Sequence, residues 1–350
     1  MTETMRGMVM LGEGEVEVWE FPKPKPVGTQ VLVRVKAAGL CGSDIHKLPN
    51  PAEGRSDRRC IRGHEPAGIV AEVGEAVTMV QVGDRVSVYH APWCGHCEDC
   101  MRGDLFNCQV LGVGNRLGTM RVDGGDADYV LVDQNVCFPL PDVLSFEDGA
   151  IIACAGGTAY HALRRADVRA GEFVLVSGLG PVGLCAVQLA AAMGGHVIGV
   201  DPEPYRRDLA LQHGAQCAID PLAEDLAARV HEITADPFGG KGVEVVIETS
   251  GNDRARADVI KAAAYHARLI YIGFGGREPN VLLGPQLGGR WITGSNMFSG
   301  VDYYELVRFM LRQGVHFHDL VTHRFPLEQA QEAFDLFVSR QTGKVMFVWD

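Results

Sequence analysis

The chain lacks any run of basic residues. Its 350 residues contain 32 Lys and Arg against 44 Asp and Glu, which gives a formal net charge of -12. Nucleic acids and anionic membrane surfaces attract basic patches, so this balance argues against both as main partners. A small molecule is the expected ligand.

An uninterrupted apolar segment long enough to span a bilayer is also missing. Residues 173–200 carry no Asp, Glu, Lys or Arg, but Gly178, Gly180, Pro181 and Gly183 divide them. The start, MTETMRGMVML, has no charged segment followed by a long apolar one, so no secretory signal is expected. The ten cysteines then indicate a reducing, cytoplasmic compartment, where metal ligands or core thiols are favoured over disulfides.

Short apolar strands punctuated by glycines dominate the first 150 residues. VLVRVKAAG (31–39), AGIVAEVG (67–74) and DRVSVYH (84–90) are examples. FPKPKPVG (21–28) fits a turn or an edge, because its three prolines cannot sit in a central strand.

The pattern changes after about residue 156 to strands that alternate with helix-like stretches such as PVGLCAVQLAAAM (181–193) and DRARADVIKAAAY (253–265). The expected strands are FVLVS (173–177), HVIGV (196–200), CAI (217–219), VEVVIE (243–248), RLIYIG (268–273) and RWITG (290–294). This alternation predicts an α/β fold, with a doubly wound, six-stranded parallel sheet of the Rossmann type.

The tail returns to a mixed pattern. Two helix-like stretches (302–314 and 327–343) precede the apolar run KVMFVW (344–349), and we expect this tail to fold back onto the first part. The predicted domains are therefore a β-rich domain of residues 1–155 and 298–350 and a Rossmann domain of residues 156–297.

The stretch SGLGPVG has the G-x-G-x-x-G pattern of a dinucleotide-binding loop, with its glycines at 178, 180 and 183. The three glycines permit a tight turn, close approach of the backbone to a pyrophosphate, and close packing of helix on strand. Asp201 ends the next strand, where a carboxylate accepts hydrogen bonds from the adenosine ribose and repels the 2′-phosphate of NADP. NAD is the expected cofactor, although Arg206 and Arg207 lie nearby and an arginine can pair with that phosphate.

Four cysteines stand in the sixteen residues WCGHCEDCMRGDLFNC, at 94, 97, 100 and 108, with a spacing of C-x2-C-x2-C-x7-C. A set of four thiolates favours the binding of zinc or an iron–sulfur cluster. The bacterial ferredoxin run continues with x3-C-P, which this stretch does not. Four thiolates fill the tetrahedral shell of zinc, so a structural site in a lobe of about residues 94–108 is expected.

A second set of candidate ligands is scattered through AGLCGSDIH, RGHEPAG and IIACAGG. Cys41, His64 and Cys154 together offer two thiolates and one imidazole, and a catalytic zinc keeps three protein ligands and one open position. Taken alone, each of these residues is a weak signal.

The chain as a whole resembles the zinc-dependent medium-chain alcohol dehydrogenases. GLCGSDIH, GHEPAGIV, the four-cysteine lobe, VDGGDADYV and SGLGPVG occur in the order and at the separations of that family. The resemblance implies a GroES-like catalytic domain and a Rossmann domain, with the active site between them. It also implies two zinc ions per chain, NAD as cofactor, and a homodimer or homotetramer, often joined through the edge strand of the Rossmann sheet.

The resemblance assigns individual roles. Cys41, His64 and Cys154 would bind the catalytic zinc, Glu65 would be an occasional further ligand, and Asp44 would orient the histidine. Ser43 and His46 would form a proton relay. The expected cofactor-binding residues are Gly178, Gly180, Pro181, Val182, Gly183, Asp201, Arg206, Thr158, Ile272, Ser295 and Met297.

The sequence constrains the identity of the substrate less than the type of reaction. A cysteine at position 154 resembles the simple alcohol dehydrogenases, whereas SDIH and the ending TGKVMFVWD resemble the polyol and threonine branch. The expected substrate is a secondary alcohol of polyol or cyclitol type, with L-threonine and simple primary alcohols as alternatives. His90 and Trp93 either hydrogen-bond this substrate or serve packing alone.

Two other classes are kept as alternatives. One is a zinc-free quinone or enoyl reductase, against which the complete ligand set argues. The other is a non-catalytic module that is cross-linked by zinc or an iron–sulfur cluster and binds the dinucleotide only as a sensor.

Overall fold

The computed structural model describes residues 3–12, 14–46, 60–111, 113–119, 121–275 and 288–350, apart from the side chains of residues 45, 46 and 113. The chain divides into two compact units. The first comprises Met1–Gly157, Phe298–Val307 and His316–Asp350, and the second comprises Thr158–Met297 and Arg308–Val315. Among the described residues, no helix is long and apolar enough to cross a membrane.

One segment belongs to a different unit in the structure than in the domains predicted from the sequence. Arg308–Val315, predicted to lie with the tail, groups with the second unit. A physical reason is the apolar face of this segment, since the Phe309 ring lies 6.0 Å from that of Tyr160 and Met310 is fully buried.

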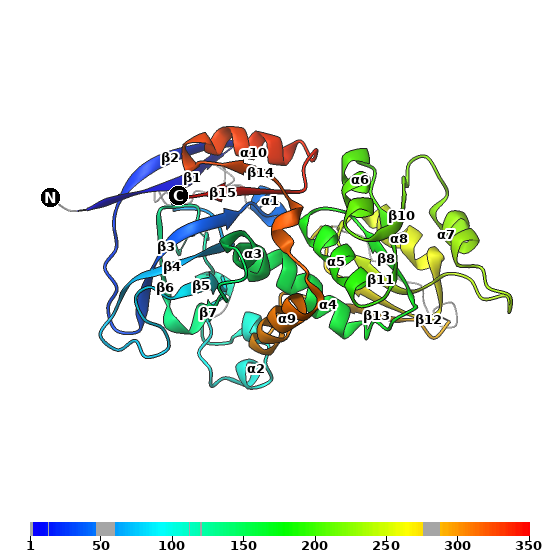
Figure 1. The fold of residues 1–350 in the computed structure, drawn as a ribbon, viewed down its shortest axis with the longest axis horizontal. Coiled ribbons are helices and arrows are strands. Elements are labelled where there is room, and N and C mark those ends of the chain that lie inside the picture. Colours follow the sequence, from blue (N-terminus) through cyan, green and yellow to red (C-terminus); the bar gives the residue numbers. More distant parts are fainter. Residues whose placement is uncertain (1–2, 13, 47–59, 112, 120, 276–287) are drawn as a thin grey trace. The chain divides into compact units, whose positions relative to one another are not determined.

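The first unit is the β-rich one, as predicted. Its main sheet has the order β14-β15-β3-β4-β5-β7, with β6 paired to β3, and β1 and β2 form a separate antiparallel pair (Figure 1). The strands are β1 (Thr4–Gly12), β2 (Glu15–Pro22), β3 (Gln30–Gly39), β4 (Pro66–Val73), β5 (Arg85–Val88), β6 (Tyr129–Asp133), β7 (Cys137–Pro139), β14 (Val321–Phe325) and β15 (Lys344–Val348). The helices are α1 (Gly42–His46), α2 (Glu98–Met101), α3 (Phe146–Ile151) and α10 (Ala330–Val338), with a π-helical turn, η5 (Ile152–Gly156).

The tail does fold back onto the first part of the chain. β15 pairs antiparallel with β3 and parallel with β14. A core cluster beneath it joins both ends of the sequence, with Met8 and Leu40 from the start packed with Phe334, Phe337 and Phe347 from the tail. Burial of these side chains stabilises the pairing of segments about 300 residues apart.

The second unit contains the predicted parallel sheet. Its strand order is β10-β9-β8-β11-β12-β13, which is the 3-2-1-4-5-6 order of a dinucleotide-binding fold. The strands are β8 (Phe173–Ser177), β9 (His196–Val200), β10 (Ala215–Ile219), β11 (Val243–Glu248), β12 (Ala263–Tyr271) and β13 (Trp291–Gly294). The helices are α4 (Gly157–Arg165), α5 (Pro181–Ala192), α6 (Pro204–Gln212), α7 (Leu226–Thr234), α8 (Asp253–Ala262) and α9 (Gly300–Gln313), the first and last of which extend into the first unit.

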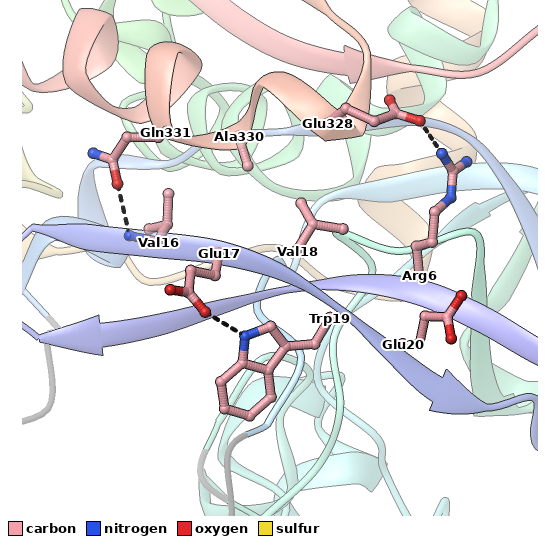
Figure 2. A pocket seen from close by; sticks show the side chains of 9 residues that line it. All are labelled: Arg6, Val16, Glu17, Val18, Trp19, Glu20, Glu328, Ala330 and Gln331. Atoms are coloured by element: carbon pink, nitrogen blue, oxygen red, sulfur yellow. Dashed lines mark hydrogen bonds and ion pairs between the residues drawn. The ribbon is translucent and has the colours of Figure 1, made fainter.

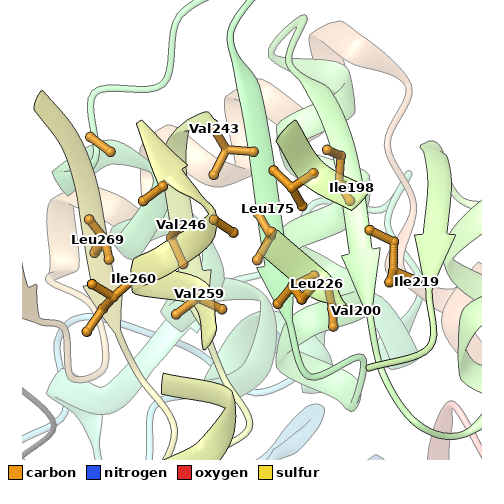
Figure 3. Close-up of a cluster of buried hydrophobic side chains, with 14 residues drawn as sticks. Leu175, Ile198, Val200, Ile219, Leu226, Val243, Val246, Val259, Ile260 and Leu269 are labelled. Atoms are coloured by element: carbon orange, nitrogen blue, oxygen red, sulfur yellow. The ribbon is translucent and has the colours of Figure 1, made fainter. Parts of the chain in front are cut away.

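Branched side chains of the strands form the core of this sheet. Leu175, Ile198 and Val246 project from adjacent strands toward α7 and α8, whose Val230 and Val259 are fully buried (Figure 3). The last four residues of β8 and of β9 are all buried, so both faces of these strands are covered, which explains why they read as short continuous apolar runs. The helix expected over 253–265 ends earlier, because residues 263–265 already belong to β12.

The first unit also has a groove along β2 and the start of α10, shown in Figure 2. Arg6 pairs with Glu328 at one end, and Gln331 accepts a hydrogen bond from the Val16 amide at the other. None of the predicted site residues lines this groove, so it is separate from the site described below.

Candidate active site

Four predicted ligands come together in the first unit although they lie on three separate segments. Cys41 lies just after β3 at the start of α1, His64 and Glu65 immediately precede β4, and Cys154 lies on the π-helical turn η5. Their ligand atoms all lie within 4.8 Å of one another. A π-helical turn is common at functional sites, and here it places the Cys154 thiol beside His64, with Sγ and Nε2 3.7 Å apart.

The donors of this cluster fit a zinc ion. A hydrogen bond from Cys154 and the charge of His64 hold the pKa of Cys41 well below its ordinary value, despite burial. The Cys41 thiol therefore loses its proton readily, and the resulting thiolate is the form that binds metal. The Oε1 atom of Glu65 is buried without a hydrogen-bond partner among the described residues and belongs to the same cluster.

Asp44 fixes the orientation of the imidazole. Its Oδ1 lies 3.0 Å from His64 Nδ1, and its Oδ2 accepts a hydrogen bond from the Cys41 amide at 2.9 Å. Burial lowers the pKa of His64, but the charges of Asp44 and Cys41 outweigh it and raise that pKa well above the ordinary value. The carboxylate therefore holds Nδ1 and turns Nε2 toward the cluster, which is the arrangement typical of metal-binding histidines.

The two predicted relay residues lie on α1 beside the cluster. The Ser43 hydroxyl donates to Cys41 Sγ at 3.6 Å, which places a group able to donate and accept at the edge of the ligand set. His46 is the last residue of α1, but its side chain lies outside the described part of the structure.

Lys344 is a buried partner of the cluster that the sequence did not reveal. It is 1% exposed, forms an ion pair with Glu65, and donates to the Leu40 carbonyl at 2.8 Å. A side chain on Gly39 would collide with both members of this pair, at 2.5 Å from Glu65 Oε2 and from Lys344 Cε. Burial raises the pKa of Glu65, and the ammonium group opposes that rise. The only sequence signal was a lysine at the head of an apolar terminal strand.

The other four cysteines form a second, closed cluster. Cys94, Cys97, Cys100 and Cys108 bring their sulfur atoms within 4.8 Å of one another. Backbone amides of Cys94 and Leu111 donate to Cys108 Sγ, at 3.3 and 3.4 Å. Amide donors around sulfur stabilise thiolates, and four thiolates fit a tetrahedral zinc ion.

The two candidate pocket residues differ in their surroundings. His90 is buried, with its ring centroid 4.9 Å from that of His64. The Trp93 ring packs against Phe138 and edge-on against Tyr89, each at 5.9 Å. His90 thus adjoins the ligand cluster, whereas Trp93 belongs to an aromatic packing cluster.

A further group with ligand-type atoms serves the fold. Asp148 is fully buried and lies near His316 and His318. Its carboxylate caps α3 together with Ser145, accepts a hydrogen bond from the His318 amide, and lies 3.0 Å from His318 Nδ1. These contacts occupy the carboxylate, and the group ties the start of α3 to the segment after α9.

The glycine-rich loop of the second unit joins β8 to α5, as expected. Gly178 has a φ of +90°, which an L-residue adopts only with strain. A Cβ on Gly183 would lie 1.9 Å from the Gly178 carbonyl oxygen, so only glycine lets α5 approach the loop. Gly180 and Pro181 begin the helix, with Val182 in its first turn, so the first amides of α5 face the loop.

Asp201 has a role in this loop that the sequence did not show. Its buried carboxylate accepts hydrogen bonds from the amides of Leu179, at 2.7 Å, and Glu203, at 2.9 Å. The two arginines differ as well. Arg207 pairs with Asp220 and donates to the Asp201 and Pro202 carbonyls. Arg206 lies by the loop itself, with its Nη1 atom 3.9 Å from the position that a Cβ atom on Gly180 would occupy.

The remaining cofactor candidates also lie in the second unit. Ile272 and Ser295 directly follow β12 and β13, at the carboxyl edge of the sheet where dinucleotides bind in this fold. Thr158 donates to Met297 Sδ at 3.6 Å, and Met297 has a positive φ of 58°. The structure thus divides the predicted site residues into two groups, ligands and relay in the first unit and cofactor residues in the second.

A GroES-like β-rich unit with two cysteine-containing clusters of metal-ligand type and a Rossmann unit define a zinc-type dehydrogenase. Residues 28–142 match the family described as alcohol dehydrogenase GroES-like domain, and residues 181–312 match the family described as zinc-binding dehydrogenase. The chain therefore belongs to the zinc-dependent medium-chain alcohol dehydrogenase family and is an oxidoreductase.

Similar proteins cover the chain from end to end. L-threonine 3-dehydrogenase from Symbiobacterium thermophilum is 36% identical, over 100% of this chain and 99% of that protein. Sorbitol dehydrogenase from Bacillus subtilis is 33% identical, over 95% and 93%. A structure described as a zinc-binding dehydrogenase from Sinorhizobium meliloti 1021, solved bound to NADP, matches with a TM-score of 0.85 at 28% identity, over 99% of this chain and 100% of that one.

Proposed function

We propose that this protein is a zinc-dependent NAD(H) alcohol dehydrogenase that reversibly oxidises a secondary alcohol to a ketone. The observation that carries this proposal is the cluster of two thiols and one imidazole, Cys41, Cys154 and His64, with Asp44 behind the imidazole. A zinc ion held there would supply Lewis acidity toward an alcohol oxygen. A nicotinamide ring bound in the second unit would accept the hydride.

The chain's own residues hold these groups and handle the proton. Asp44 keeps the His64 ring in one orientation, and Lys344 holds one oxygen of Glu65, so that the other remains available to the cluster. We propose that Ser43 takes the proton of the substrate hydroxyl and that His46 passes it to solvent. An imidazole suits this exchange because it titrates near neutral pH.

Removal of the Ser43 hydroxyl tests the relay. Ser43→Ala should lower kcat by about 10²–10⁴-fold with the zinc content unchanged, whereas Ser43→Thr, which keeps a hydroxyl, should lose much less. His46→Gln should reduce kcat less and steepen its dependence on pH, with partial rescue by small buffers. An unchanged pH–rate profile in His46→Gln would remove His46 from the mechanism.

For the substrate, we propose a secondary alcohol of the polyol or cyclitol type, with L-threonine-like and simple primary alcohols as alternatives. Relatives named sorbitol dehydrogenase and L-threonine 3-dehydrogenase support this range. NADH formation with a panel of polyols, cyclitols, aminocyclitols, simple alcohols and L-threonine tests the proposal. NADH formation only with primary alcohols would contradict the assignment of a secondary alcohol.

We propose two zinc ions per chain, the second held by the closed four-cysteine cluster in a structural role. Cys100→Ser should then release one zinc per chain and lower the unfolding temperature by at least about 5 °C, because metal binding contributes to folding. Cys217→Ser, which changes a cysteine outside both clusters, should alter neither quantity. Elemental analysis and calorimetry measure the two effects, and an unchanged zinc content in Cys100→Ser would contradict the assignment.

We propose NAD rather than NADP as the cofactor, supported by the Asp201 carboxylate beside the glycine-rich loop. Asp201→Ala should lower the ratio of kcat/KM for NAD to that for NADP by at least about tenfold, because a ribose acceptor and a repulsive charge are lost together. Asp208→Ala, an exposed residue on α6, is the control. A wild-type preference for NADP would show that Arg206 or Arg207 decides instead.

We further propose that the protein acts in the cytoplasm as a homodimer or homotetramer on a small-molecule alcohol, and not on nucleic acid or membranes. Sedimentation of the purified protein tests the oligomeric state.

A further inference from the structure

Glu248 is a fully buried acid at the end of β11, in the second unit. Its Oε1 accepts hydrogen bonds from the amides of Ser250, at 2.8 Å, and Gly251, at 3.1 Å, and from the Ser250 hydroxyl. Its Oε2 lies 3.4 Å from Nε of Arg256, a largely buried residue of α8. The carboxylate thus turns the chain after β11 and holds one arginine beside it.

Arg256 uses its two remaining nitrogens on the segment that follows β12. Nη2 donates to the Gly273 carbonyl at 2.7 Å, and Nη1 donates to the Gly275 carbonyl at 2.9 Å. A second acid of α8, Asp253, lies 4.0 Å from Nη1, and the centroid of the Tyr271 ring lies 5.8 Å from Cζ. The planar guanidinium therefore connects an acid to two backbone carbonyls, which a lysine ammonium could not span.

The segments after β11 and β12 pack backbone against backbone. A Cβ on Gly251 would lie 2.1 Å from the Phe274 carbonyl oxygen, and a Cβ on Gly273 would lie 2.2 Å from the Gly251 amide nitrogen. The Glu248 carbonyl also accepts hydrogen bonds from the amides of Ile272, at 2.8 Å, and Gly273, at 3.1 Å. A displacement of one segment therefore displaces the other.

The segment after β11 contacts the glycine-rich loop as well. The Thr249 hydroxyl donates to the Gly178 carbonyl at 2.6 Å, and a Cβ on Gly178 would lie 2.7 Å from the Ser250 amide nitrogen. The segments that follow β8, β11 and β12 thus form one packed group at the carboxyl edge of the sheet. In this fold the dinucleotide binds at that edge, where the strand order reverses, which here is between β8 and β11.

The two halves of such a sheet bind different halves of a dinucleotide. The glycine-rich loop and Asp201 belong to the half made of β8, β9 and β10, which takes the adenosine side. The nicotinamide side then falls to β11, β12 and β13, where Arg256 ties two edge segments together. A side chain that fixes these segments in advance reduces the ordering that cofactor binding would otherwise require.

We infer that Arg256, held by Glu248, is a positioning residue for the nicotinamide half of the cofactor. It acts through the backbone of residues 273–275, which directly follow the predicted cofactor residue Ile272. This inference rests on the proposed dehydrogenase function and adds to it a determinant of cofactor affinity.

The experiment compares the binding of NADH with that of ADP, which contains only the adenosine side. Fluorescence titration gives the Kd of NADH and calorimetry gives the Kd of ADP, both for zinc-loaded protein. Arg256→Gln should raise the Kd of NADH at least about tenfold, because the donors to two carbonyls are lost and the segment must be ordered on binding. The Kd of ADP should stay within about twofold, because its half of the sheet is unchanged. An arginine that served stability alone would not separate the two ligands.

Two further variants control the comparison. Arg256→Lys keeps the charge beside Glu248 but cannot span both carbonyls, so the Kd of NADH should rise at least about threefold with that of ADP unchanged. Arg254→Gln removes an exposed arginine that pairs with Asp258 on the same helix, and it should change neither Kd. If Arg256→Gln does not fold, Arg256→Lys carries the test. A protein that binds only NADPH is tested in the same way with NADPH and adenosine 2′,5′-bisphosphate.

Failure of the inference differs from failure of the function on which it rests. Unchanged NADH affinity in Arg256→Gln, or in Arg256→Lys where only that variant folds, would overturn the role of Arg256. An equal loss of affinity for NADH and ADP would overturn it too, because the arginine would then serve the fold alone. Both results leave the dehydrogenase function intact. Wild-type protein that binds neither NADH nor NADPH would overturn the proposed function itself.

Discussion

Cys41→Ser should abolish alcohol oxidation while the protein remains folded. Cys41 is one of three proposed zinc ligands, and a serine hydroxyl does not ionise near neutral pH and binds zinc poorly. Loss of this ligand should lower kcat by at least about 100-fold, because the Lewis acid is lost or displaced. Steady-state NADH formation measures this effect, with elemental analysis reporting one zinc fewer per chain.

The reciprocal pattern of two cysteine variants makes this prediction specific. Cys41→Ser should leave the unfolding temperature nearly unchanged, because the cluster lies between elements that are already held by sheet pairing and core packing. Cys100→Ser should show the opposite pattern in stability. If Cys41→Ser kept its zinc and its kcat, the cluster around His64 would not be the catalytic centre.

Lys344→Met should strongly destabilise the first unit. Methionine has a similar shape, but the change leaves the Glu65 carboxylate buried without its cation and removes the donor to the Leu40 carbonyl. Breaking one side of a buried ion pair lowers the free energy of unfolding by about 3–5 kcal/mol. Denaturant-induced unfolding of the zinc-loaded protein measures this loss.

Two further variants test the physical reason. The double variant Glu65→Gln with Lys344→Met has no buried charge at this position, so it should recover a substantial part of the lost stability. Lys261→Met removes an exposed lysine that pairs with Asp258 on the surface of α8, and it should change stability little. A double variant no more stable than Lys344→Met alone would show that shape, rather than charge, sets the effect.

The parts of the fold with a repeating local pattern were predictable from the sequence. Alternation of short apolar strands with helix-like stretches predicted the six-stranded parallel sheet, and KVMFVW was rightly expected to return to the β-rich part. The end of α8 and the grouping of residues 308–315 were not predicted, because alanine-rich segments and amphipathic helices leave such boundaries open.

The sequence predicted those parts of the candidate site whose residues stand at characteristic spacings along the chain, as in the four-cysteine lobe and the glycine-rich loop. Lys344 had no such signal. Lys344 meets Leu40 from 304 positions away, and its burial is visible only after the terminal strand has paired. Asp201 was expected to serve the cofactor, but its hydrogen bond to Leu179 depends on the folded loop.

The most direct test of the central claim is a titration of zinc into metal-free protein, with NADH formation from a secondary alcohol as the readout. We expect no activity without metal and full activity once both clusters are filled. Cys41→Ser should stay inactive at every zinc concentration. Full activity in the metal-free protein, or no NADH formation with any alcohol after two zinc ions have bound, would contradict it.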